Sequence, residues 1–226
     1  MSGKGETSFA AIFLDIDGTL VDSNEYHVKA WEQAFRLAGL AIATALIRKQ
    51  IGKGADQLIP ALAPELPEAK RKPLADSHDE IFRSEYLPKV RGFAQATELV
   101  ARLHDEDIQV VLASSANQAE VDHYVQLLGI EKFLAATTCA DDVEKSKPAG
   151  DIFAAALQKV SPMTADKTLA VGDTPYDAIA AGACGIRSIG VLTGGFSAEE
   201  LRDAGMFEIY ASVAELLEKR LPKQGE

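Results

Sequence analysis

Residues 9–16 (FAAIFLDI) form a nearly continuous apolar run that ends among aspartates. A strand that helices cover on both faces, as in a parallel sheet, has this pattern. Comparable runs follow at 108–113, 168–171 and 187–192, with a weaker one at 134–138. Helical patterns separate them, at about 93–106, 117–128, 148–160 and 175–183. This alternation of strands and helices predicts an α/β fold with a doubly wound, Rossmann-like parallel sheet.

The segment 22–91 interrupts the alternation, because it contains helical patterns and no predicted strand. Apolar residues recur at helical spacing from His27 onward, and Gly39 is a typical helix stop. We therefore predict an α/β core domain and an inserted all-helical cap domain. The core comprises residues 1–21 and 92–226, the cap comprises residues 22–91, and the hinges lie near 21–24 and 88–92.

The charge and hydropathy of the chain exclude two classes of partner. Binding to nucleic acid needs clustered Lys and Arg, which this sequence of net charge −11 does not show. No apolar run approaches the length of about 18 residues that a membrane helix needs, and the opening MSGKGETS lacks the hydrophobic centre of a signal peptide. We predict a cytoplasmic protein with no nucleic-acid or membrane partner, and the sequence leaves both monomer and dimer open.

Polar residues gather where the predicted strands end. They are Asp15 and Asp17, Ser114, Lys147, and Asp173 with Asp177. In an open parallel sheet, ligands bind at the carboxyl ends of the strands, beside the point where strand order reverses. Carboxylates brought together there repel one another unless a cation lies among them, and oxygen ligands suit Mg²⁺. No His or Cys set favours zinc, so we predict a magnesium site.

Four short motifs give these residues a family resemblance. The stretch DIDGTLVDS at 15–23 resembles the first signature of the haloacid dehalogenase-like (HAD) superfamily in its phosphatase form. LAS at 112–114, SKP at 146–148 and GDTPYD at 172–177 resemble the second, third and fourth signatures. Their order and their positions beside predicted strands make the resemblance specific, and it spans residues 9 to about 195.

The resemblance implies a role for each aspartate. Asp15 is expected to be the nucleophile, which forms an aspartyl-phosphate. Asp17 is expected to protonate the leaving alcohol and then to accept a proton from the attacking water. Asp15, the backbone carbonyl of Asp17, and Asp173 are expected to hold Mg²⁺. Asp177 is expected to support the metal or its waters.

The same resemblance implies how the phosphoryl group is bound. Ser114 and Lys147 are expected to contact its oxygens, together with backbone N–H groups around Gly18 and Thr19. Two cap residues are weaker candidates for the substrate site. His27 lies in a stretch similar to beta-phosphoglucomutases, where a histidine faces the site, although a packed or surface histidine is equally open. Lys53, in the loop 51–55 (IGKGA), either reaches the site or belongs to a simple connection between cap helices.

Other polar residues are interpreted as helix caps. Asp22 and Ser23 are expected to cap the first cap helix. Thr174 is expected to cap a helix that begins with Pro175.

These motifs leave several functions to compare. We favour a phosphatase of the phosphoglycolate-phosphatase-like branch, whose partner is a small-molecule phosphorylated substrate. The first alternative is a beta-phosphoglucomutase-like sugar-phosphate mutase, but those mutases carry glutamate where this chain has Gly172, and the arginine of their cap loop is absent from 52–56. A catalytically idle member that binds a ligand or partner is a further alternative, against which the intact carboxylate set argues.

Overall fold

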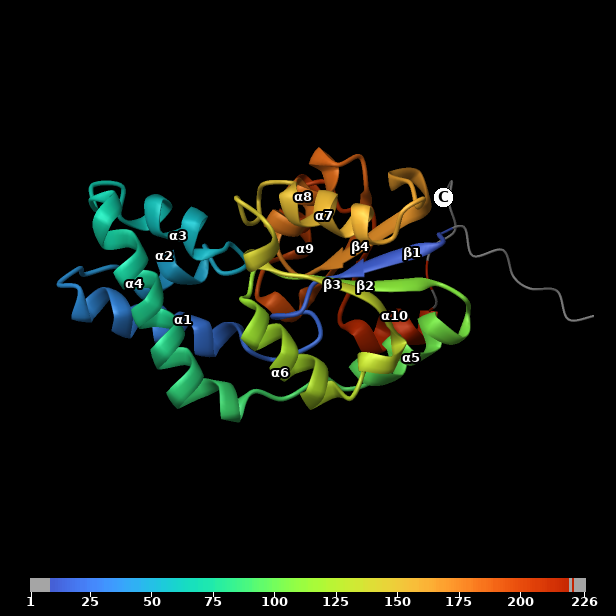
Figure 1. Cartoon of the computed structure of the whole chain (residues 1–226), viewed down its shortest axis with the longest axis horizontal. Helices are drawn as coiled ribbons and strands as arrows, with labels where there is room; N and C mark the ends of the chain where they lie inside the picture. The colour runs from blue at the N-terminus through green and yellow to red at the C-terminus, as the bar shows by residue number, and fades with distance from the viewer. Residues whose placement is uncertain (1–8, 220, 222–226) are drawn as a thin grey trace, which may run out of the picture.

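The computed structural model describes residues 9–219 and 221, which form a sheet-based core and a group of helices at one end of it (Figure 1). Among the described residues, the core holds a six-stranded sheet in the order β3-β2-β1-β4-β5-β6, and each pair of neighbouring strands is parallel. The strands are β1 (Ala11–Leu14), β2 (Gln109–Ala113), β3 (Leu134–Thr138), β4 (Thr168–Gly172), β5 (Arg187–Val191) and β6 (Ile209–Tyr210). The predicted doubly wound sheet is confirmed, and only the short β6 was not predicted.

Helices cover both faces of the sheet, as the alternation predicted (Figure 1). The core helices are α5 (Ala96–Asp105), α6 (Gln118–Leu128), α7 (Asp151–Lys159), α8 (Pro175–Ala183), α9 (Ala198–Asp203) and α10 (Val213–Lys219). Ile12 and Leu14 of β1 pack in the hydrophobic cluster that includes α5, α6 and α10, whereas Ala11 and Phe13 pack in the cluster that includes α7 and α8. Successive side chains of a strand point to opposite faces, so a buried strand must be apolar throughout.

The inserted segment is helical and has its own apolar cluster. Its elements are α1 (Asn24–Leu37), α2 (Thr44–Arg48), α3 (Ala55–Leu62) and α4 (Glu68–Ile81), followed by a π-helical turn (Phe82–Tyr86) and a 3-10 turn (Leu87–Lys89). Trp31 and Phe35 of α1 pack with Leu58 of α3 and Leu74 of α4. These helices form the cap.

The two chain crossings between core and cap lie side by side. Asp22 N–H donates to Arg91 O at 2.9 Å, and Val21 pairs with Gly92 in an antiparallel bridge. The predicted domain limits, 21/22 and 91/92, therefore fall where the two segments that link core and cap are hydrogen-bonded to each other. The division into two domains stays a prediction. Among the described residues, no helix combines the length and the hydrophobicity needed to cross a membrane.

Truncating Phe13 should test how much the central strand contributes to stability. Phe13 is fully buried and stacks on Phe153, with 6.3 Å between the ring centroids. We expect Phe13→Ala to lower the free energy of unfolding by about 3 to 5 kcal/mol, because the substitution leaves a cavity. Urea unfolding measures the loss. Leu37→Ala is the control, because Leu37 is 72% exposed; an equal effect of both variants would contradict this account of the core.

Candidate active site

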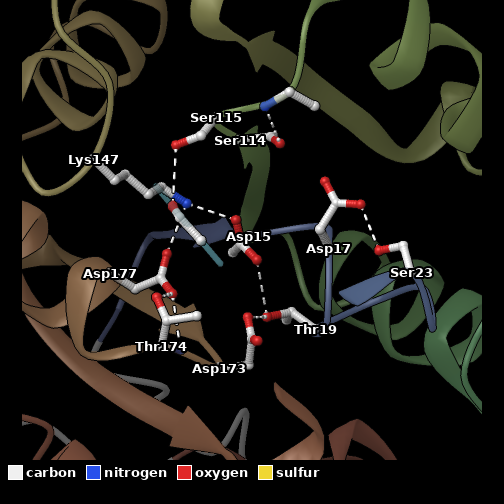
Figure 2. Close-up of polar contacts among 12 residues, drawn as sticks. Asp15, Asp17, Thr19, Ser23, Ser114, Ser115, Lys147, Asp173, Thr174 and Asp177 are labelled. Carbon is white, nitrogen blue, oxygen red and sulfur yellow. Dashed lines mark hydrogen bonds and ion pairs between the residues drawn. The ribbon is translucent and has the colours of Figure 1, made fainter. Parts of the chain in front are cut away.

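The ends of β1 and β4 place two aspartates next to each other. Leu14 of β1 lies in register with Val171 of β4, and the Asp15 N–H donates to Val171 O at 2.9 Å. Asp15 and Asp173 follow these strands directly (Figure 2). Because β1 lies between β2 and β4, this edge is also where the strand order reverses, which is the usual ligand site of such a sheet.

Three buried carboxylates meet at this edge. Asp15, Asp173 and Asp177 each offer an oxygen, and these oxygens lie within 4.8 Å of one another. Burial raises the pKa of Asp15 to about 7 although Lys147 opposes the shift, and burial together with the charge of Asp15 raises the pKa of Asp173. Asp15 and Asp173 would ionise more readily beside an added positive charge. The donor set is hard oxygen, so it fits Mg²⁺.

Lys147 supplies one positive charge to this group. Its side chain is fully buried, and its Nζ donates to Asp15 Oδ1 at 2.6 Å and to Asp177 Oδ1 at 2.7 Å (Figure 2). Although burial opposes the shift, these two carboxylates raise the pKa of Lys147. Asp177 also accepts from the N–H and Oγ of Thr174, at 3.0 and 2.7 Å, in the predicted cap of α8. One aspartate thus fixes both the helix start and the lysine.

Hydroxyl and amide groups complete the contacts of the carboxylates. Thr19 Oγ1 lies 3.2 Å from Asp15 Oδ2 and donates to Asp173 Oδ1 at 3.0 Å. Asn24 Nδ2 donates to Asp173 Oδ2 at 2.9 Å, a contact that is not predicted by any of the four motifs. The backbone N–H groups of Gly18 and Thr19 donate to turn carbonyls, so they could bind a phosphate only if these hydrogen bonds open.

The Asp17 side chain contacts residues of the cap and lies apart from the cluster of three buried aspartates. Its Oδ1 accepts from Ser23 Oγ at 2.5 Å and lies 3.1 Å from His27 Nε2. In Figure 2 its side chain lies on the Ser23 side of the site, away from Lys147. Although burial opposes the shift, His27 and Ser23 lower the pKa of Asp17. Ser23 stands at the N-cap position of α1, as predicted, but the predicted capping hydrogen bond is absent. Its hydroxyl contacts Asp17 instead of a helix N–H.

A cavity of about 310 Å³ opens beside these residues. Asp15, Asp17 and Ser114 line it from the core, and His27 and Lys53 line it from the cap. Ser114 is buried, and its Oγ accepts from the Ala116 N–H at 3.0 Å.

Lys53 reaches the cavity but does not contact the carboxylates. Its Nζ donates to Gln50 Oε1 at 2.5 Å and lies 4.6 Å from the centre of the Tyr176 ring. Lys147, Asp173 and Asp177 are not among the residues that line the cavity, and Lys147 contacts Asp15, which does line it.

Comparison with known proteins agrees with this geometry. A family model described as haloacid dehalogenase-like hydrolase matches residues 12–191. The chain is 30% identical over 189 residues to a phosphoglycolate phosphatase of Agrobacterium fabrum, covering 81% of this chain and 80% of that protein. It is 26% identical over 172 residues to the pyrophosphatase PpaX of Oceanobacillus iheyensis, covering 76% of this chain and 78% of that protein.

A solved structure gives the same result for the whole fold. The crystal structure of a hydrolase from Pseudomonas syringae superposes with a TM-score of 0.87 at 26% identity, covering 93% of this chain and 97% of that one. The match of the family model extends from β1 to β5 and includes the four motifs. This chain therefore belongs to the haloacid dehalogenase-like hydrolase family.

Proposed function

We propose that this chain is a Mg²⁺-dependent phosphatase that hydrolyses a small phosphorylated metabolite through an aspartyl-phosphate on Asp15. The observation that carries the proposal is the position of Asp15. Its carboxylate lies at the wall of the cavity, with Lys147 against one oxygen and Thr19 against the other. The relatives named phosphoglycolate phosphatase and pyrophosphatase support a phosphate-bearing substrate.

The reaction divides into two displacements. In the first, an Asp15 oxygen forms a bond to phosphorus, the ester P–O bond breaks, and Asp17 gives its proton to the leaving oxygen. In the second, water attacks the phosphorus of the aspartyl-phosphate, Asp17 takes a proton from that water, and Asp15 is released. Ser114 and Lys147 bind the phosphoryl oxygens and stabilise their charge.

The metal would be held by the carboxylates of Asp15 and Asp173 and the backbone carbonyl of Asp17, with Asp177 supporting the site. When bound, Mg²⁺ reduces the repulsion between the Asp15 carboxylate and the phosphate. It would also keep Asp15 ionised, which a nucleophile requires and which burial opposes.

Gly172 supports hydrolysis over the mutase alternative. A Cβ at position 172 would lie 2.3 Å from Asp177 Cγ. The glutamate expected there in a beta-phosphoglucomutase would therefore displace Asp177 and its contact with Lys147. The idle alternative is disfavoured by the complete set of buried carboxylates, which a binding protein does not need.

Removing the charge of Asp15 should abolish turnover. We expect Asp15→Asn to lower kcat on an aryl phosphate by at least about a thousandfold, because the variant lacks the nucleophilic oxygen charge. In the wild type, EDTA should stop hydrolysis and Mg²⁺ should restore it. Phosphate release measures both effects, with Asp22→Asn, at an exposed aspartate, as the control. Normal turnover by Asp15→Asn would refute the proposal.

A methyl group at position 172 should damage the site without unfolding the protein. Gly172→Ala would push Asp177 away from Lys147, and we expect about a hundredfold loss of kcat, as for a displacement of about 1 Å in a catalytic site. Gly182→Ala is the matched control, because a Cβ at this position in α8 meets nothing within 4 Å. Steady-state kinetics compare the two variants. Equal activities would show that the position of Asp177 does not matter.

Substituting Lys53 should affect the hydrolysis of some substrates, whereas substituting Lys147 should affect the hydrolysis of all of them. We expect Lys53→Ala to raise KM by about tenfold for metabolites that reach the cap. A change of this size corresponds to the loss of one hydrogen bond from a charged group. A small aryl phosphate should be hydrolysed almost as before. Lys147→Ala should depress all substrates by a similar factor, because Lys147 acts on the shared phosphoryl group. Measuring kcat and KM over a panel of phosphorylated metabolites tests both expectations. If Lys53→Ala changes neither value for any metabolite, the loop 51–55 only connects two cap helices and does not bind substrate.

A further inference from the structure

Asn24 joins the cap to an aspartate of the proposed metal site. It is the first residue of α1, and its Nδ2 donates to Asp173 Oδ2 at 2.9 Å. The other oxygen of Asp173, Oδ1, accepts from Thr19 Oγ1 at 3.0 Å (Figure 2). Asp173 is fully buried, and no lysine or arginine of the described residues forms an ion pair with it. These two hydrogen bonds therefore orient its carboxylate.

Two glycines make the space that the Asn24–Asp173 pair occupies. A Cβ at Gly18 would lie 2.2 Å from both Asn24 Nδ2 and Asp173 Oδ2. A Cβ at Gly194 would lie 1.8 Å from Asp173 Oδ2. Gly18 has a φ of 81°, a conformation that glycine adopts without strain. The turn after β1 and the segment after β5 thus both leave room for this hydrogen bond.

The amide oxygen of Asn24 has no partner. Oδ1 is buried and forms no hydrogen bond among the described residues. When Asp173 holds a cation it is ionised and can only accept, so Nδ2 must face it. Turning the amide over would place Oδ1 against the carboxylate. A buried acceptor without a partner is unfavourable, and such atoms often receive a hydrogen bond from an ordered water or face an ion.

We propose that Asn24 is a positioning residue of the metal site, which orients Asp173 through Nδ2 and offers Oδ1 to a water of the bound cation. The inference rests on the proposed Mg²⁺ site and adds a residue of the cap to it. Mg²⁺ keeps several waters when a protein binds it through one or two carboxylates, and those waters need acceptors. The start of the first cap helix then contributes to how tightly the core binds its metal.

The first test measures the binding of Mg²⁺ itself and needs no substrate. Asn24→Leu keeps nearly the same side-chain shape but has neither a donor nor an acceptor. We expect this variant to bind Mg²⁺ about tenfold more weakly, the lower end for residues that hydrogen-bond to a metal ligand. Isothermal titration calorimetry, or competition with Mn²⁺ followed by EPR, measures the affinity.

Gln33→Leu is the matched control for this measurement. Gln33 lies on the same helix, and its Nε2 donates to Tyr86 OH at 2.7 Å, so the variant also loses a side-chain hydrogen bond of α1. Gln33 does not contact the aspartates of the site, and Gln33→Leu should keep the Mg²⁺ affinity of the wild type.

Thermal unfolding separates this role from a purely structural one. If Asn24 only anchored the start of α1, its loss would lower the melting temperature equally in EDTA and in Mg²⁺. We instead expect Asn24→Leu to melt close to the wild type in EDTA, because it removes an unpaired buried acceptor together with the hydrogen bond. Added Mg²⁺ should then raise its melting temperature less than that of the wild type. Asn24→Ala allows the same comparison if Asn24→Leu folds poorly.

The wild type and the variants together decide the outcome. An unchanged Mg²⁺ affinity in Asn24→Leu and Asn24→Ala, or the same gain in melting temperature from Mg²⁺ as in the wild type, would overturn the proposal. Either result would leave the proposed function intact. A wild type that hydrolyses an aryl phosphate but binds no Mg²⁺ would instead refute the metal dependence of the proposed function, and the role of Asn24 with it.

Discussion

One buried lysine lies among three buried carboxylates, and the rest of the site depends on this imbalance of charge. Lys147 pairs with Asp15 and Asp177, while Asp173 receives only hydrogen bonds from Thr19 and Asn24. Burying a charge that lacks a partner costs several kcal/mol, and burial raises the pKa of both Asp15 and Asp173. A divalent cation among their oxygens would offset that cost. A nucleophile that is poorly ionised without a metal is the physical reason why we propose metal-dependent hydrolysis.

The sequence predicts this group well because it depends on the sheet. Apolar runs buried on both faces are recognisable, and parallel strands bring their carboxyl ends to one edge. Asp15 and Asp173 directly follow adjacent parallel strands, so they lie close together independently of the conformation of the loops. Asp177 is three residues into a helix whose start, Thr174-Pro175, is itself predictable from its cap. The four motifs also indicate the family, since their order along the chain is specific to it.

The environment of Asp17 could not be predicted in the same way. Gly18, with φ of 81°, turns the chain out of the strand, so alternation no longer tells where the neighbouring side chains point. Ser23 is a good capping residue by propensity, but its tertiary contact with Asp17 replaces the cap. His78 and Asp79 carry no motif. His78 contacts His27 only because α4 packs against α1, and the packing of two helices in an insertion has no short sequence signature.

We propose that Asp15, and not its neighbours Asp17 or Asp173, receives the phosphoryl group. An aspartyl-phosphate is an acyl phosphate, so borohydride added during turnover reduces the modified side chain to that of homoserine, which peptide mass spectrometry locates. We predict this product at position 15 in the presence of Mg²⁺ and substrate, and its absence when substrate is left out. Modification of a different aspartate, or of none during confirmed turnover, would contradict the role of Asp15 as the nucleophile.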